Sequence, residues 1–88
     1  MGQVAAVHVL TSEDPEFNFD KVAKDIQNVV PAGIKVVRAE VKPLAFGLKM
    51  LEVTTIMQDS EGFIEKLENA YAAIPGIAGV EAKEVGLI

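Results

Sequence analysis

Two segments of the chain show the apolar spacing of amphipathic helices. In residues 19–30, apolar side chains recur every three or four positions, which places them on one face of an α-helix. Residues 61–74 repeat this spacing and end at a Pro-Gly pair. Asn18 is a suitable N-cap of the first helix, because its side chain can accept a hydrogen bond from a free backbone amide, and Ser60 is expected to cap the second.

Four other segments have the apolar runs and the alternation of β-strands. They cover residues 3–10, 34–42, 48–58 and 79–88. In the second of these strands, the alternation predicts that Val37, Ala39 and Val41 share one face. In the third, Leu51, Val53, Thr55 and Met57 share a face. The last strand is expected to make apolar contacts through Val80 and Ala82, with Val85 and Leu87 as further candidates.

The predicted elements follow one another in the order β-α-β-β-α-β. Neither helix can bury its apolar stripe alone, so we expect both helices to cover one face of a four-stranded antiparallel sheet. Right-handed crossovers place the first and third strands in the centre, which gives the strand order 4-1-3-2. The expected fold is therefore α+β, a ferredoxin-like split βαβ, in a single domain over residues 1–88. The uncovered face of the sheet and the loops are where function is expected.

Composition excludes several classes of function. The 88 residues include 8 basic and 13 acidic side chains, which gives a net charge of −5 at pH 7. This charge disfavours direct binding of nucleic acid, which needs a basic surface for the phosphates. The predicted central strands also lack the aromatic side chains with which RNA-recognition domains of this topology stack on bases. No apolar run is long enough to cross a membrane, so we expect no membrane contact. The absence of Cys fits a reducing compartment, so we expect a cytoplasmic protein.

Few groups in the sequence can carry covalent or metal chemistry. There is no Cys, and His8, the only histidine, lies in an apolar strand, so we interpret it as a structural or surface residue. Asp59 and Glu61 are close together, but the spacing of a metal-binding loop does not follow them. Phosphate-binding glycine motifs are also missing. The protein is therefore predicted to be no enzyme and to have no cofactor and no metal site.

Basic residues concentrate in the middle of the chain. Lys35, Arg38, Lys42 and Lys49 are half of the 8 basic residues. Together with Phe46 they are predicted to cluster at the hairpin that joins the second and third strands. Two interpretations remain open at this point. The residues form a solvated strand face beside a core Phe, or they form a protein-docking tip with an aromatic anchor and a basic rim.

The segment Pro-Leu-Ala-Phe-Gly-Leu-Lys, residues 43–49, resembles a motif of the archaeal translation elongation factor 1-beta family. The eukaryotic guanine-exchange domain shares that motif, which is Pro, an apolar residue, Ala or Gly, an aromatic, Gly, an apolar residue and often Lys. The Leu51-Glu52-Val53 stretch and the acidic turn at residues 58–61 fit as well. The similarity extends over essentially the whole chain.

This resemblance implies a guanine-nucleotide exchange factor for elongation factor 1-alpha, the GTPase that brings aminoacyl-tRNA to the ribosome. In the family the motif's aromatic enters the GTP-binding domain of that partner, which assigns this role to Phe46. Gly47 would allow close backbone approach, and Pro43 would stiffen the loop. Lys42, Lys49 and Lys83 complete the predicted partner-binding residues.

One position departs from the eukaryotic pattern. The eukaryotic domain has a Lys next to its C-terminal residue, thought to disturb the Mg²⁺ site of the GTPase, whereas this chain has Leu87 there. Either Lys83 or Lys49 replaces that cation, or GDP release relies on distortion of the GTPase.

The alternative function is that of a ferredoxin-like regulatory module that binds a small molecule. Such a module needs a loop after the first strand whose amides can bind a carboxylate. Glu13 and Asp14 occupy that loop here and would repel one.

Overall fold

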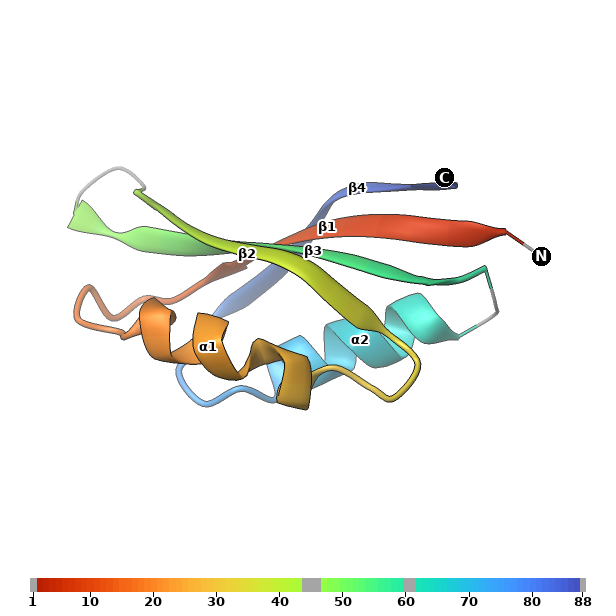
Figure 1. Cartoon of the computed structure of the whole chain (residues 1–88). Coiled ribbons are helices and arrows are strands. Elements are labelled where there is room, and N and C mark those ends of the chain that lie inside the picture. The colour runs from red at the N-terminus through yellow and green to blue at the C-terminus, as the bar shows by residue number, and fades with distance from the viewer. Residues whose placement is uncertain (1, 44–46, 60–61, 88) are drawn as a thin grey trace.

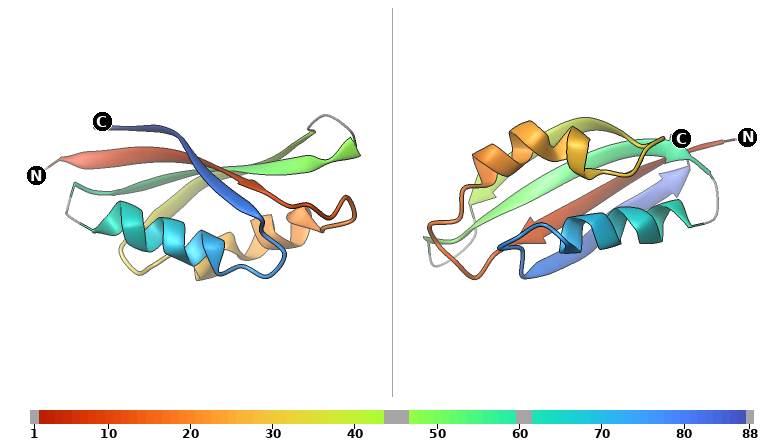
Figure 2. Two further views of the ribbon diagram at one scale, coloured as in Figure 1. Left: turned by 180° about the vertical axis from the view of Figure 1, so that it is seen from behind. Right: turned by 90° about the horizontal axis from the view of Figure 1, so that it is seen from below.

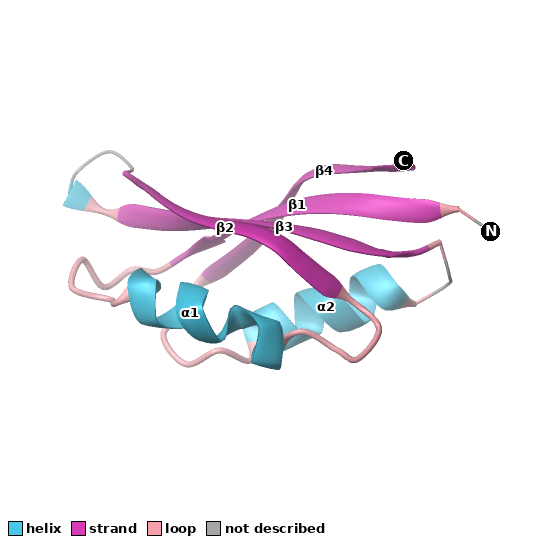
Figure 3. Cartoon of the chain, in the orientation of Figure 1, coloured by secondary structure: helices cyan, strands magenta, loops and turns pink. Residues whose placement is uncertain are grey.

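A computed structural model of the chain describes residues 2–43, 47–59 and 62–87 (Figure 1). Its elements are β1 (Gln3–Thr11), α1 (Phe19–Val29), β2 (Lys35–Pro43), β3 (Lys49–Gln58), α2 (Phe63–Ala72) and β4 (Gly79–Leu87). The strands form an antiparallel sheet in the order β2-β3-β1-β4, which confirms the predicted order. Both helices lie on the same side of this sheet, as predicted (Figure 3).

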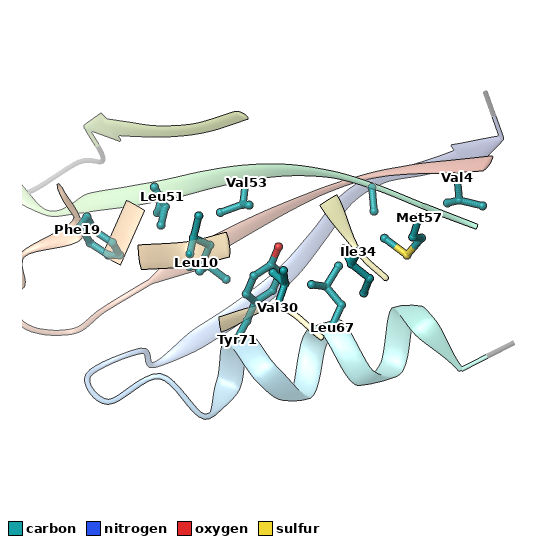
Figure 4. Packing of buried hydrophobic residues seen from close by; sticks show 12 residues of the cluster. Val4, Leu10, Phe19, Val30, Ile34, Leu51, Val53, Met57, Leu67 and Tyr71 are labelled. Atoms are coloured by element: carbon teal, nitrogen blue, oxygen red, sulfur yellow. The ribbon is translucent and has the colours of Figure 1, made fainter. Parts of the chain in front are cut away.

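The hydrophobic core fills the space between the sheet and the two helices. Figure 4 shows its packing between the sheet and α2, with the parts of the chain in front cut away. Alternate residues of β1 and β3 are buried, and Leu51, Val53, Thr55 and Met57 all face this side, as the sequence predicts. Leu67 and Tyr71 project from α2 toward the sheet, and Ile26 is buried on α1. The core is aliphatic apart from a few rings, because the chain has few aromatic residues.

The two helices begin in different ways. In α1 the side chain of Asn18 accepts a hydrogen bond from the backbone amide of Lys21, which confirms the predicted N-cap. In α2 the N-cap is Gly62, which has no side chain to accept such a bond. The predicted start at residue 61 was therefore wrong, and Ser60 itself lies outside the described residues.

A β-bulge in β2 changes the predicted faces of this strand. The pairing of β2 with β3 shifts between Val36 and Arg38, so Val37 is an extra residue and is 46% exposed. The prediction that Val37 shares the face of Ala39 and Val41 was wrong, because a bulge interrupts the alternation. Val36 packs against the core in its place, together with Ala39 and Val41.

A second bulge lies in β4. The pairing of β4 with β1 shifts at Lys83, which has no opposite residue in the ladder. Beyond this point β4 turns away from α2 (Figure 1). Val80 packs against the core, but Ala82 and Val85 are exposed and Leu87 is 72% exposed. The prediction that Ala82, Val85 and Leu87 make apolar contacts was therefore wrong, because the helix layer does not cover them.

Candidate functional site

The side of the sheet opposite the helices is an open face. In the views of Figure 2, both helices cover one side, and none of the described elements covers the other. Val7 and Val9 of β1 lie on this face, since they alternate with the buried residues of the strand. Glu52 and Thr54 of β3 lie beside them and are half-buried. The open face thus combines small apolar side chains with charged ones.

Glu52 is the centre of an ion-pair network on this open face. Its Oε1 atom accepts a hydrogen bond from Lys42 Nζ at 3.2 Å, and its Oε2 atom accepts one from Lys83 Nζ at 3.1 Å. Because β1 lies between β3 and β4, the side chain of Lys83 has to cross β1 to reach Glu52. The hydrogen bond from Lys83, followed by that from Lys42, lowers the pKa of the Glu52 carboxyl below its ordinary value.

The network continues along the edge strand β2. Arg38 Nη2 donates to Glu40 Oε2 at 2.7 Å, and Lys42 Nζ lies 4.0 Å from the same oxygen. Three cations and two carboxylates thus form a continuous chain from β2 to β4. The structure brings together Lys42 and Lys83, which are distant in the sequence, and adds Glu52, for which no separate role was predicted.

Lys49 lies on the other side of the sheet. It pairs with Pro43 at the hairpin end, but it alternates with Met50 and so shares the helix-facing side with Leu51. There it borders a small hollow together with Asp20 at the start of α1. The predicted partner-binding residues Lys42 and Lys49 therefore point to opposite faces of the sheet.

Pro43 and Gly47 are both exposed at the hairpin end of β2 and β3. Gly47 has φ +76°, a conformation that a side chain would disfavour although the space around it is open. Phe46 lies outside the described residues, so its predicted role as an anchor stays a prediction.

The predicted basic cluster at the hairpin does not form. Lys35 pairs with Ile56, whereas Pro43 pairs with Lys49 at the other end of the same ladder. A strand rises about 3.3 Å per residue, so Lys35 and Lys42 are roughly 20 Å apart. Arg38 lies between them and is engaged by Glu40. Closeness in sequence was misleading because the residues follow an extended strand.

The hairpin and the C-terminal end of β4 lie at opposite ends of the sheet (Figure 1). Leu87 pairs with Val4 at the start of β1, whereas Met50, next to the hairpin, pairs with Thr11 at the end of β1. Lys83 lies before the C-terminal end of β4 and is bound to Glu52. It therefore does not occupy the position of the eukaryotic lysine.

His8 belongs to the core and not to the open face. It is fully buried, and its Nε2 atom lies 3.0 Å from Glu68 Oε2. Its ring meets the ring of Tyr71 edge to face, with the centroids 5.4 Å apart. Burial raises the pKa of the Tyr71 hydroxyl above its ordinary value. These contacts agree with the interpretation of His8 as a structural residue.

A groove of about 980 Å³ lies between α1 and α2, on the helix side of the molecule. Its walls include Phe17, Val22 and Ile74, with Lys21 and Lys24 among the polar residues. None of the predicted partner-binding residues that the structure describes lines this groove.

The described ranges contain neither a cluster of metal ligands nor a membrane-spanning helix. No group of three His, Asp or Glu side chains in them could hold a metal ion. None of the helices described is long and apolar enough to cross a membrane.

Comparison with known proteins gives matches over almost the entire chain. The profile of the EF-1 guanine nucleotide exchange domain matches residues 5–88. Elongation factor 1-beta of Methanococcoides burtonii is 36% identical over 86 residues, which cover 98% of this chain and 97% of the relative. The protein of the same name from Natronomonas pharaonis is 34% identical over 88 residues and 100% of both chains. That of Methanosarcina mazei is 38% identical over 96% of both.

A solved structure shows the same architecture in a distant protein. The C-terminal domain of the MgtC protein from Mycobacterium tuberculosis matches with a TM-score of 0.63, over 98% of this chain and 87% of that domain. At 17% identity this likeness concerns the fold alone. The sequence relatives are archaeal elongation factors, and they match from end to end. The chain therefore belongs to the EF-1 guanine nucleotide exchange domain family, whose members act in translation elongation.

Proposed function

We propose that this protein promotes the release of GDP from elongation factor 1-alpha and so allows GTP to bind. The observation that carries the proposal is the match to the exchange domain over residues 5–88, within which the motif of residues 43–49 falls at the hairpin end of the sheet. The family implies a translational GTPase as partner, and elongation factor 1-alpha is the specific partner that we propose.

Exchange of this kind needs no covalent step, so the proposal describes a binding protein and not an enzyme in the covalent sense. A factor that binds the nucleotide-free GTPase more tightly than the GDP-bound form must weaken GDP binding by the same factor. The chain's own contribution is therefore a surface that fits the nucleotide-free partner. The proposal also implies a cytoplasmic location, where translation takes place.

The hairpin end provides a loop whose two sides are conformationally restricted. Pro43 ends β2 with a fixed φ, and Gly47 adopts a positive φ on the other side of the loop. The resemblance assigns the anchoring side chain to Phe46, between these two residues. In the proposed complex, this loop is presented to the partner at one end of the sheet.

The positions of the lysines favour one of the release mechanisms that the sequence left open. Lys83 is bound to Glu52, and Lys49 lies at the hairpin end on the helix side. Neither residue lies at the C-terminal end, where Leu87 stands. We therefore expect GDP release to rely on distortion of the GTPase rather than on a cation placed at its Mg²⁺ site.

The alternative function, that of a ferredoxin-like regulatory module that binds a small molecule, receives less support. The loop before α1 is acidic, and Asp14 Oδ1 accepts a hydrogen bond from the backbone amide of Glu16 at 2.9 Å. The carboxylates of Glu13, Asp14 and Glu16 would repel an anionic ligand in this loop.

The proposal is tested by the release of fluorescently labelled GDP from elongation factor 1-alpha. We expect catalytic amounts of the domain to accelerate release at least tenfold over the spontaneous rate, with saturation as the concentration of the domain rises. Heat-unfolded domain is the control for non-specific effects. Release that stays at the spontaneous rate at every concentration of folded domain would contradict the proposal.

A further inference from the structure

We propose that Lys42 and Lys83, held in place by Glu52, form a receptor on the open face for an acidic side chain of the GTPase partner. This inference rests on the proposed function for the identity of the partner. It adds a contact on the sheet surface that the hairpin motif does not contain, and it makes Glu52 a positioning residue.

Both lysines keep hydrogen-bond donors that Glu52 does not use. Each lysine ammonium group has three N–H donors, and each uses one on Glu52. The side chain of Lys83 is 59% exposed and that of Lys42 is 36% exposed, so both lysines are accessible to an anion from solvent. At this point two ammonium groups meet the single carboxylate of Glu52, and the next carboxylate of the network is that of Glu40, 4.0 Å from Lys42 Nζ.

Glu52 holds the two lysines in place before a partner binds. The side chain of Glu52 is only 14% exposed, because the sheet surface surrounds it. It fixes one lysine from each edge strand of the sheet at the same place. A free surface lysine loses much rotamer entropy when it binds an anion, and ordering it beforehand reduces that loss on complex formation.

Acidic residues near the two lysines limit the class of anion that can bind there. Glu81 and Glu84 pair with Val9 and Val7 and so lie on the same face as the lysines. These carboxylates would repel an extended polyanion such as RNA, whereas one carboxylate of a folded protein needs only the donors of the two ammonium groups that Glu52 does not use. The half-buried Val7 and Val9 beside the site suit contact with another protein surface.

The test removes the charge of each lysine and keeps its apolar stem. In Lys83→Met and in Lys42→Met, we expect the domain concentration that half-saturates GDP release to rise about tenfold, which corresponds to roughly 1.4 kcal/mol of binding. The maximal release rate should stay unchanged, and the salt dependence should weaken. The matched control is Lys66→Met, an exposed lysine on the helix side, which should stay within twofold of wild type.

Glu52→Gln separates positioning from net charge, because the two effects have opposite signs. If only the overall electrostatic attraction between the domain and an acidic partner mattered, the loss of a negative charge from the domain would strengthen binding. We expect weaker binding, with the half-saturating concentration about fivefold higher, because the lysines lose their common anchor. Glu81→Gln changes the charge equally on the same face and should not weaken binding. In the Lys83→Met background, Glu52→Gln should have a smaller effect than in wild type.

The outcomes distinguish this inference from the function on which it rests. Wild-type activity with unchanged Lys42→Met and Lys83→Met variants would overturn the receptor and leave the exchange function standing. Glu52→Gln that binds more tightly, as a pure charge effect would, overturns its positioning role. Binding of labelled tRNA to the wild-type domain that both lysine variants abolish would assign the site to phosphate instead. A wild-type domain that does not accelerate GDP release would overturn both proposals.

Discussion

At the scale of single residues, the site depends on which face of a strand each side chain occupies. Lys42 and Lys49 flank the same hairpin, yet Lys42 joins Glu52 on the open face while Lys49 lies on the helix side. The basic segment and the family resemblance predict both as partner-binding residues, and neither of these takes account of the face of the sheet to which a side chain points. The contact of Lys83 with Glu52 across β1 follows from the sheet order and the bulge together, and it could not be found in the sequence.

Phe46→Ala tests the anchor that the family motif assigns. We expect its melting temperature to stay that of wild type, while stimulated GDP release falls at least tenfold, which corresponds to roughly 1.4 kcal/mol in the transition state. The control is Phe63→Ala, since Phe63 packs against the core and its truncation should lower the melting temperature. A Phe46→Ala domain that melts early, with activity that follows its folded fraction, would assign Phe46 to the core instead.

The lysines beside Glu52 also predict a pH dependence of stability. The pKa of Glu52 is lower in the folded domain than its ordinary value of 4.5, so the folded state binds this proton less readily than the unfolded state. The resulting stabilisation is present above that ordinary value and is lost as the pH falls through the folded pKa. In urea unfolding at pH 7 and at pH 3, Glu52→Gln should therefore lose less stability on acidification than wild type. An equal loss in both proteins would show that the ion pairs do not contribute.

At the scale of the elements, the helices and the central strands follow the sequence closely, whereas the edge strands do not. The central strands β1 and β3 alternate without interruption, because they are paired on both sides and buried on one face. Each edge strand contains a bulge. The bulge in β2 exposes Val37, and the bulge in β4 leaves Lys83 without an opposite residue in the ladder with β1. Bulges at the edges of a sheet also discourage pairing with a second molecule. Their positions depend on the pairing of strands, which a single sequence does not show.

The turn between α2 and β4 supplies a prediction at this scale. Gly76 has φ +91°, and a Cβ atom there would collide with the ring of Phe17. We expect Gly76→Ala to lower the free energy of unfolding by roughly 2–4 kcal/mol, through backbone strain and overpacking. Gly86→Ala in the exposed end of β4 has open space around it and should change stability by less than about 0.5 kcal/mol. Equal effects of the two substitutions in urea unfolding would contradict this account.

At the scale of the whole molecule, the length of the sheet separates the hairpin from the C-terminal end of β4. The family resemblance implies that both regions contact the partner. The hairpin adjoins Met50, and Leu87 lies across β1 from Met57 at the far end of the sheet. With about 3.4 Å per residue along β3, these regions are more than roughly 20 Å apart. One partner that contacts both regions must therefore extend along most of the sheet, and the open face with Glu52 lies between them.

This separation predicts that the two ends contribute independently. Leu87 is 72% exposed, so Leu87→Ala should leave the melting temperature unchanged, and we expect it to lower stimulated GDP release about threefold through lost apolar contact. Substitutions this far apart with no shared contacts add in free energy, so Leu87→Ala should have the same proportional effect in the Phe46→Ala background as in wild type. The measurement is GDP release by the four proteins at a domain concentration well below saturation. An unchanged rate for Leu87→Ala alone would exclude the C-terminal end from the contact, and a double variant no slower than Phe46→Ala would show that the two ends act through one another.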